Sequence, residues 1–402
     1  MLRFTMVALI AVSSAMSAPV SAQDNEKPAA ETDASNSSDV TVPDGIIPDR
    51  IASGLVKGPV FRFAIHNLVY SPDGKTLAAG SGDGMVFLWN LSQKKKSIEM
   101  KAQRVQAHED WTFSIAWTPD GKQLITGGGD NLIHTFDVDG IASWYRESKL
   151  SGFQGINVAY KERPTKTFKG HAQDVHAVAL TSDGRSLVSA GDDKQVIIWD
   201  FETQKIVRRL SGHKKQIPTL AVSPDDSLIA TGSRDHSIRL WELSTGKVVR
   251  ILAGHTGDVM SVRFSPDGKQ LASTSYDGTV RVWNVDNGAS VSVLKGHTGW
   301  VFSVKFSPDG KHLASAGDKT VRLWDLATGK TKWTMQLKEQ IVMKTRSIDQ
   351  HAAFVAFSPD GDQIAVASTA GTATILNAET GTIIRTILAW GKRLKQGKQL
   401  SQ

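Results

Sequence analysis

The 402-residue sequence contains no cysteine. That absence excludes disulfide bonds, thiolate zinc sites, iron–sulfur clusters, covalently attached haem, a cysteine nucleophile and a lipidated N-terminal cysteine. No apolar stretch reaches the ~20 residues that a membrane-spanning helix needs. The sequence also lacks the patterns G-x-x-x-x-G-K-[ST], H-E-x-x-H and G-x-S-x-G, which mark common phosphate, metalloprotease and hydrolase sites. With 40 % hydrophobic and 22 % charged residues, the composition is that of a soluble globular protein.

The first 22 residues have the features of a secretory signal. Arg3 provides a short positive region, Phe4 to Val12 form an apolar run, and Val20-Ser21-Ala22 fits a cleavage site. Residues 1–22 are therefore expected to be a signal peptide. The mature protein is expected in the periplasm, in the cell envelope or outside the cell. The alternative is an uncleaved N-terminus, which would make the protein a cytoplasmic assembly factor.

Charge is unevenly distributed along the chain. Residues 23–45 hold six acidic residues and one lysine, a net charge of −5, and few large apolar side chains, which predicts a disordered acidic spacer. The whole chain carries +7, of which Arg3 contributes +1, so residues 46–402 carry +11. Part of this excess lies in a basic C-terminal tail over residues 391–402. It points to an anionic partner or envelope surface, or only to solubility, while nucleic acid is a poor candidate for an exported protein.

Tight-turn signals recur along the sequence with a period near 42 residues. Each is a tetrapeptide similar to Ser-Pro-Asp-Gly, in which Pro presets φ, Asp bonds to its own backbone and Gly accepts positive φ. The seven copies begin at residues 71, 118, 181, 223, 265, 307 and 358. A period of this length is characteristic of a repeat architecture.

One repeat, residues 247–285, shows how each unit is built. Its strand-like segments cover residues 247–252, 259–264, 271–275 and 280–285, and none has a helical period. Four short strands joined by tight turns predict a four-stranded antiparallel meander. Stacked meanders bury each other's faces, and closing the stack into a ring removes the exposed ends. The sequence therefore predicts an all-β fold, a seven-bladed β-propeller of four-stranded antiparallel blades over residues 46–390.

Two dipeptides recur at fixed places in the repeats. Gly-His pairs end at His171, His213, His255 and His297, and Trp-Asp-like pairs begin at Trp89, Trp199, Trp241, Trp283 and Trp324. On these residues the chain resembles the WD-repeat β-propellers, as an exported, bacterial-type member with seven repeats. The resemblance is specific for the fold and says little about activity, because the fold hosts many functions.

The same resemblance leaves ring closure open. The family usually completes its last blade with a strand from the N-terminus. Here either Thr382 to Leu388 or Ile51 to Lys57 could provide the outer strand of the seventh blade.

A His, hydroxyl and Asp set recurs in the repeats and has the composition of a catalytic triad. A catalytic set is needed once, whereas this one occurs in at least four repeats. The resemblance implies that these residues and the Trp form a structural hydrogen-bonded network that ties the strands of one blade. The expected network comprises His171, Ser189, Asp193 and Trp199; His213, Thr231, Asp235 and Trp241; His255, Ser273, Asp277 and Trp283; and His297, Ser315, Asp318 and Trp324.

Three repeats depart from this set. The second keeps His108, Thr126 and Asp130 but has Phe136 in place of Trp. The first and seventh have lost more positions, with residues such as Ala79 and Val366 where a hydroxyl is expected. These two repeats meet at the ring closure, so local opening is expected to begin there.

Residues that vary between repeats mark the expected partner-binding face. They lie three positions after the repeated His or just before the turn Asp, and Trp, Tyr and Arg among them are types enriched at interface hot spots. Two insertions break the period, over residues 138–169 and 337–350, and the second is expected over this face. The alternative for Trp111 and Trp300 is that they are buried starts of strands. The candidate partner-binding residues are Trp111, Asp174, Asp192, Arg234, Asp258, Tyr276, Trp300, Lys344 and Arg346.

These observations favour a non-catalytic protein-interaction scaffold with no catalytic residues, cofactor or metal. The alternative is an enzyme or small-ligand binder that uses the mouth of the central channel, where Asp174 and His176 come nearest to a site. Several unpaired acids or histidines clustered there would favour the alternative.

Overall fold

The computed structural model describes residues 64–92, 102–139, 163–337, 352–369 and 371–388, together with the backbone of 340–343 and 346–349. All of these lie in one compact unit, Lys57–Gln402. The signal peptide, the acidic spacer, the basic tail and Lys344 lie outside the described residues, as do the segments Ile51 to Lys57 and 140–162. In the part that is described, no helix is long and apolar enough to cross a membrane.

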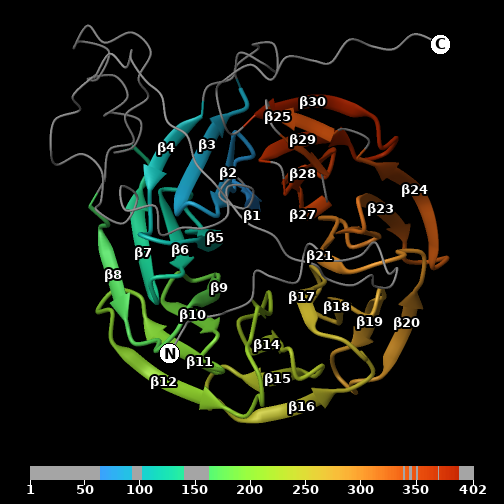
Figure 1. Cartoon of the computed structure of the whole chain (residues 1–402). Coiled ribbons are helices and arrows are strands. Elements are labelled where there is room, and N and C mark those ends of the chain that lie inside the picture. The colour runs from blue at the N-terminus through green and yellow to red at the C-terminus, as the bar shows by residue number, and fades with distance from the viewer. Residues whose placement is uncertain are drawn as a thin grey trace, which may run out of the picture. The chain divides into compact units, whose positions relative to one another are not determined.

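Seven four-stranded antiparallel sheets, here called blades 1 to 7, form the unit (Figure 1). Blade 1 contains β1 (Ile65–Tyr70), β2 (Thr76–Ser81), β3 (Met85–Asn90) and β4 (Gln103–Gln106). Blade 2 contains β5 (Thr112–Trp117), β6 (Gln123–Gly128), β7 (Leu132–Asp137) and β8 (Lys166–Lys169). Blade 3 contains β9 (Val175–Leu180), β10 (Ser186–Gly191), β11 (Gln195–Asp200) and β12 (Ile206–Ser211).

The remaining blades follow the same order along the chain. Blade 4 contains β13 (Thr219–Val222), β14 (Leu228–Gly232), β15 (Ile238–Glu242) and β16 (Val248–Leu252). Blade 5 contains β17 (Val259–Phe264), β18 (Gln270–Ser275), β19 (Val280–Asn284) and β20 (Ser290–Leu294). Blade 6 contains β21 (Val301–Phe306), β22 (His312–Gly317), β23 (Thr320–Asp325) and β24 (Lys330–Gln336). Blade 7 contains β27 (Ala352–Phe357), β28 (Gln363–Ser368), β29 (Thr372–Asn377) and β30 (Ile383–Leu388).

The blades close into a ring, which confirms the predicted seven-bladed propeller. The innermost strands contact one another in sequence, from β1 to β5, β9, β13, β17, β21 and β27, and β27 contacts β1. In Figure 1 these strands surround the centre and the outer strands, such as β12, β16 and β20, form the circumference. The outer strand of blade 7 is β30, paired with β29. The C-terminal segment therefore supplies the strand that the sequence left undecided.

The sequence-derived repeat and the blade are offset by one strand, which corrects the proposed meander of residues 247–285. Its first strand, β16, pairs with β15 of blade 4, while its other three strands belong to blade 5. Each repeat therefore contributes its first strand to the preceding blade. A single-sequence pattern shows where strands occur, but only the hydrogen-bond ladder shows which strands share a sheet.

The core lies between neighbouring blades. Second strands are buried on both faces, as in the run Leu271 to Ser275, because a blade packs on each side of them. One cluster joins Ala230 and Leu240 of blade 4 to Val262 and Trp283 of blade 5. Burial on both faces explains the short apolar runs in the sequence. Outer strands such as β16 are mostly exposed and include Arg as well as Val.

The repeated tetrapeptides form the turns between first and second strands. In blade 5 the Ser265 hydroxyl donates to Asp267 Oδ1 at 2.5 Å, the Lys269 N–H donates to the same oxygen at 3.1 Å, and Gly268 has φ of +73°. These hydrogen bonds lower the pKa of the Asp267 carboxyl. The carboxylate is thus used inside its own turn, as expected for an Asx-type turn.

Candidate functional site

The repeated His, hydroxyl, Asp and Trp residues lie together in blades 3 to 6. In blade 5, His255 Nδ1 lies 2.8 Å from Asp277 Oδ2 and His255 Nε2 lies 2.8 Å from Ser273 Oγ. Trp283 Nε1 donates to the same serine oxygen at 2.8 Å. The Ser273 side chain is fully buried, so its hydroxyl is not presented to a substrate. The same contacts occur at His171, Ser189, Asp193 and Trp199; at His213, Thr231, Asp235 and Trp241; and at His297, Ser315, Asp318 and Trp324.

The aspartate of each set also fixes the loop that precedes the blade. Asp277 accepts hydrogen bonds from the backbone N–H groups of Thr256 and Thr279. Although burial alone would raise the pKa of Asp277, the bonds from His255, Thr279 and Thr256 hold that pKa well below its usual value. The set therefore joins the loop before the first strand to the turn before the third strand.

This junction places the variable residues in pairs at one end of blades 3, 4 and 5. The backbone N–H of Asp192 donates to the carbonyl of Asp174, and that of Tyr276 donates to the carbonyl of Asp258, both at 3.0 Å. Arg234 is held in the same way by the carbonyl of Gln216. Each pair combines a residue three positions after the His with the residue just before the turn Asp. Neighbouring blades then bring successive pairs side by side.

The side chains around these pairs form a line across blades 3, 4 and 5, in which Asp192 of blade 3 interacts electrostatically with Arg234 of blade 4. His176 Nε2 lies 3.0 Å from Asp192 Oδ1 in blade 3. Across the boundary between blades 4 and 5, Arg234 Nε lies 3.9 Å from Asp258 Oδ2. His236 Nε2 lies 3.5 Å from the other oxygen of Asp258. Acidic and basic groups thus alternate along the line.

Aromatic residues continue the line at both ends. In blades 5 and 6, Tyr276 stacks on Trp300 with ring centroids 4.6 Å apart, and Phe302 meets Tyr276 edge to face at 5.7 Å. In blade 2, Trp111 stacks on Phe113 at 5.7 Å. Trp111 and Trp300 are both half-buried, so each keeps part of its ring accessible. We call the set Trp111, Asp174, Asp192, Arg234, Asp258, Tyr276 and Trp300 the variable surface.

Burial shapes the electrostatics at the middle of the variable surface. Asp192 and Arg234 are only 3 % and 9 % exposed. Burial lowers the pKa of the Arg234 guanidinium, and the nearby Asp192, Tyr276 and Asp258 oppose that shift. Burial raises the pKa of Tyr276 to about 12, so its hydroxyl stays protonated at neutral pH. The Nε and Nη2 atoms of Arg234 are buried and have no hydrogen-bond partner among the described residues.

Sequence reasoning missed several residues that border the variable surface. His66, Phe113 and Phe302 hold the second position of the first strand in blades 1, 2 and 6, the place that His176 holds in blade 3. His66 lies 4.5 Å from Trp111 by ring centroids, and burial, reinforced by nearby His176, lowers its pKa to about 3. A comparison of this one position across the repeats would have found them.

Arg346 lies on β26 (Arg346–Asp349), which pairs with β25 (Gln340–Met343) in the second insertion.

Two groups of side chains among the described residues could hold a metal ion: Asp174, His176 and Asp192, and His108, Asp130 and His134. The first group belongs to the variable surface, where His176 already pairs with Asp192 and Arg234 stands nearby. Asp174 has its own interaction partner. His176 Nε2 and Asp192 Oδ1 are buried and form no hydrogen bond, although they lie 3.0 Å apart, so this group keeps the alternative of a small-ligand site open.

The fold, the repeated network and the sequence matches define the class of protein. The family model of the WD domain, G-beta repeat matches residues 57–90 and 100–137, and the model of the WDR36/Utp21 second beta-propeller domain matches residues 159–324. The chain is therefore a seven-bladed β-propeller built from WD repeats.

Curated relatives share part of this chain. It is 32 % identical to WD repeat-containing protein 1 of Xenopus tropicalis, over 37 % of this chain and 30 % of that protein. It is 29 % identical to Cell division cycle 20.1, cofactor of APC complex, of Arabidopsis thaliana, over 36 % of this chain and 25 % of that protein. It is also 29 % identical to one subunit of Chromatin assembly factor 1 of Gallus gallus, over 34 % of this chain and 16 % of that protein. The match thus spans less than a third of each relative.

Proposed function

We propose that this propeller is a non-catalytic scaffold that binds a protein partner through the variable surface. The observation that supports the proposal is the division of labour within each repeat. Residues that recur from blade to blade are consumed in the buried network, whereas residues that differ gather at one end of the ring. Two of the similar proteins are named as a subunit or a cofactor of a protein complex, which agrees with this role.

The chemistry of the variable surface suits a partner with an acidic or amide group beside an apolar one. Tyr276 and Trp300 offer stacked, half-buried rings, and such aromatic side chains carry much of the energy at interfaces. Arg234 lies one blade away with two buried nitrogen atoms that lack a partner in the described chain. The positive charge of the Arg234 guanidinium favours a carboxylate or amide oxygen of the partner over a cationic group.

We further propose export of the mature protein after cleavage near Ala22. The short positive region, the apolar run and the small-residue cleavage pattern of residues 1–22 support it. N-terminal sequencing of the protein purified from its native source should find Gln23 at the start. The basic tail over 391–402 would then be available to an anionic envelope surface, and its deletion should weaken adsorption to anionic vesicles at low salt.

Affinity capture from the native envelope tests the binding surface. Trp300→Ala and Arg234→Ala should each weaken capture of the partner by about 30-fold, the loss expected for a hot spot near 2 kcal/mol. Val249→Ala is the matched control, because Val249 is 47 % exposed on the outer strand β16, away from the variable surface. Circular dichroism should show that all three variants are folded. Partner capture that is unchanged by both Trp300→Ala and Arg234→Ala would reject this surface.

A further inference from the structure

Blade 2 differs from blades 3 to 6 at two positions of its third strand. The residue that pairs with the network hydroxyl across the ladder is His134 in blade 2, opposite Thr126. In blades 4, 5 and 6 that place holds Arg239, Arg281 and Arg322. Two residues further along the strand, blade 2 has Phe136, whereas blades 3, 4, 5 and 6 each have Trp. Blade 2 therefore adds a second imidazole and removes the indole N–H.

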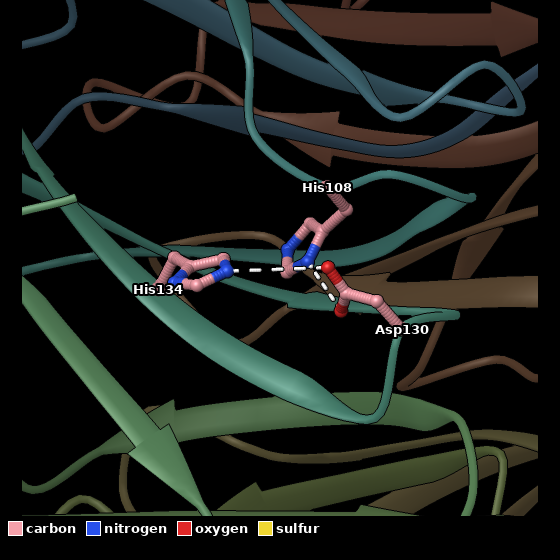
Figure 2. A group of neighbouring side chains, drawn as sticks. All are labelled: His108, Asp130 and His134. Carbon is pink, nitrogen blue, oxygen red and sulfur yellow. Dashed lines mark hydrogen bonds and ion pairs between the residues drawn. The ribbon is translucent and has the colours of Figure 1, made fainter. Parts of the chain in front are cut away.

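The added imidazole faces the same aspartate as the repeated histidine. His108 lies in the loop before β5, His134 lies on β7, and Asp130 lies in the turn between β6 and β7. Figure 2 shows the two imidazoles converging on the Asp130 carboxylate. His108 Nδ1 lies 2.8 Å from Asp130 Oδ1, and His134 Nε2 lies 3.9 Å from Asp130 Oδ2. One ligand atom from each residue falls within 4.8 Å of the other two.

Both imidazoles are oriented by a threonine on their other nitrogen. His108 Nε2 lies 2.9 Å from Thr126 Oγ1, and His134 Nδ1 lies 3.0 Å from Thr167 Oγ1 on the outer strand β8. A histidine that binds a metal usually has its second nitrogen fixed by such a hydrogen bond, which sets the ring orientation and the tautomer. Here the two threonines leave Nδ1 of His108 and Nε2 of His134 directed toward the carboxylate.

The loss of the indole changes where the proton on His108 can reside. In blades 3 to 6 the Trp N–H donates to the network hydroxyl. This bond favours donation of the hydroxyl's proton to the histidine Nε2. Phe136 has no N–H, so Thr126 can accept from His108 Nε2 and donate to the carbonyl of His134, 3.5 Å away. Without a metal, the Nδ1–H of His108 donates to Asp130. A cation that displaced this proton would leave the ring proton on Nε2, where Thr126 accepts it.

We propose that His108, Asp130 and His134 form a binding site for a divalent zinc-type metal ion, with a His–Asp–His set that the other blades lack among the described residues. Two imidazole nitrogens and a carboxylate oxygen are ligands that Zn²⁺ accepts at about 2.0–2.2 Å, and ligands at that distance from one ion lie roughly 3–4 Å apart. The side chains of His108, Asp130 and His134 are 0 %, 13 % and 11 % exposed, so the site is enclosed yet reachable from its rim. The ion ties β7 to the loop before β5.

The test is a titration of the full, chelator-treated chain with ZnCl₂ alone, followed by calorimetry. The wild type should bind one Zn²⁺ saturably. His134→Arg installs the residue that blades 4 to 6 tolerate at this place and should weaken the affinity at least 100-fold. Thr167→Val removes only the orienting hydroxyl, so it should weaken the affinity about 10-fold. With CoCl₂ as the probe, the wild type should give visible d–d absorption that His134→Arg abolishes.

Two histidine variants serve as controls. His312→Gln changes a half-buried histidine of β22 that belongs to neither metal-competent group, and it should leave the affinity unchanged. His176→Asn disables the other group, on the variable surface, and it should also leave the affinity unchanged. Thermal unfolding without metal should show that His134→Arg is folded. A wild type that binds no Zn²⁺, or a folded His134→Arg that binds it with unchanged affinity, would overturn the proposal.

Discussion

The same tryptophan position has different bonding in different blades. Trp283 donates its indole N–H to Ser273, and three other blades have the equivalent bond. In blade 1, Ala79 stands where a hydroxyl is expected. The Nε1 atom of Trp89 is buried and has no hydrogen-bond partner among the described residues. Trp89 is nevertheless fully buried against Phe87, so packing alone holds it in place.

This difference gives a prediction at the scale of one residue. Trp283→Phe should lower the free energy of unfolding by about 1 kcal/mol more than Trp89→Phe, because both lose ring atoms but only Trp283→Phe loses a hydrogen bond. Chemical denaturation of both variants measures the difference. If Trp89→Phe is the more destabilising of the two, the indole bond is not what distinguishes the blades.

At the residue scale, the sequence predicted which positions repeat and which vary, because repetition is visible in one chain. It could not show that Arg234 of blade 4 approaches Asp258 of the next repeat, or that His134 faces Asp130. Those neighbours depend on the ladder register and on the packing between blades. The second position of each first strand, which includes His66 and Phe302, carried a signal that was visible only after the strands were aligned.

The blades differ in the number of polar side-chain contacts that join their strands. Blades 3 to 6 have the full network, and blade 2 keeps its His108, Thr126 and Asp130 contacts. Among the described residues, blades 1 and 7 have no histidine-to-hydroxyl contact. Their polar contacts include Gln106 to the Asp83 carbonyl in blade 1 and Ser368 to Thr372 in blade 7. Packed cores still fill both blades, so they fold with the ring but with fewer internal ties.

Native-state hydrogen exchange tests this contrast between blades. Amide protons of β2, β3, β28 and β29 should exchange at least about tenfold faster than those of β14, β15, β18 and β19, because local opening in blades 1 and 7 breaks no buried network. These strands hold equivalent places in their blades, so position in the sheet is matched. Blades 1 and 7 emerging as the best protected would contradict the prediction.

At the scale of the whole molecule, ring closure depends on the C-terminal segment. The first strand of blade 1, β1, contacts β27, the first strand of blade 7. The outer strand of blade 7, β30, comes from the C-terminal segment, as the other strands of that blade do. All four strands of the last blade are therefore consecutive in sequence. Among the described residues, closure rests on packing between β1 and β27.

Truncation from each end should therefore have unequal effects. A chain that begins at Lys57, the boundary of the compact unit, should keep its thermal unfolding midpoint within a few degrees. Removal of residues 383–402 takes away β30, including the fully buried Ile387, and should lower the midpoint by about 5–15 °C. Removal of 389–402 alone is the matched control and should have little effect. Equal losses from both ends would show that the N-terminal segment also completes the ring.

The all-β class, the number of repeats and the turns follow from the sequence alone, because the 42-residue period and the local turn chemistry need no long-range information. The sequence also separated repeated residues from variable ones. The folded structure was needed to show which strands share a blade, which segment forms the outer strand of blade 7, and which side chains of different repeats meet. Those outcomes depend on hydrogen-bond pairing and on packing between segments far apart in the chain, and no local pattern encodes them.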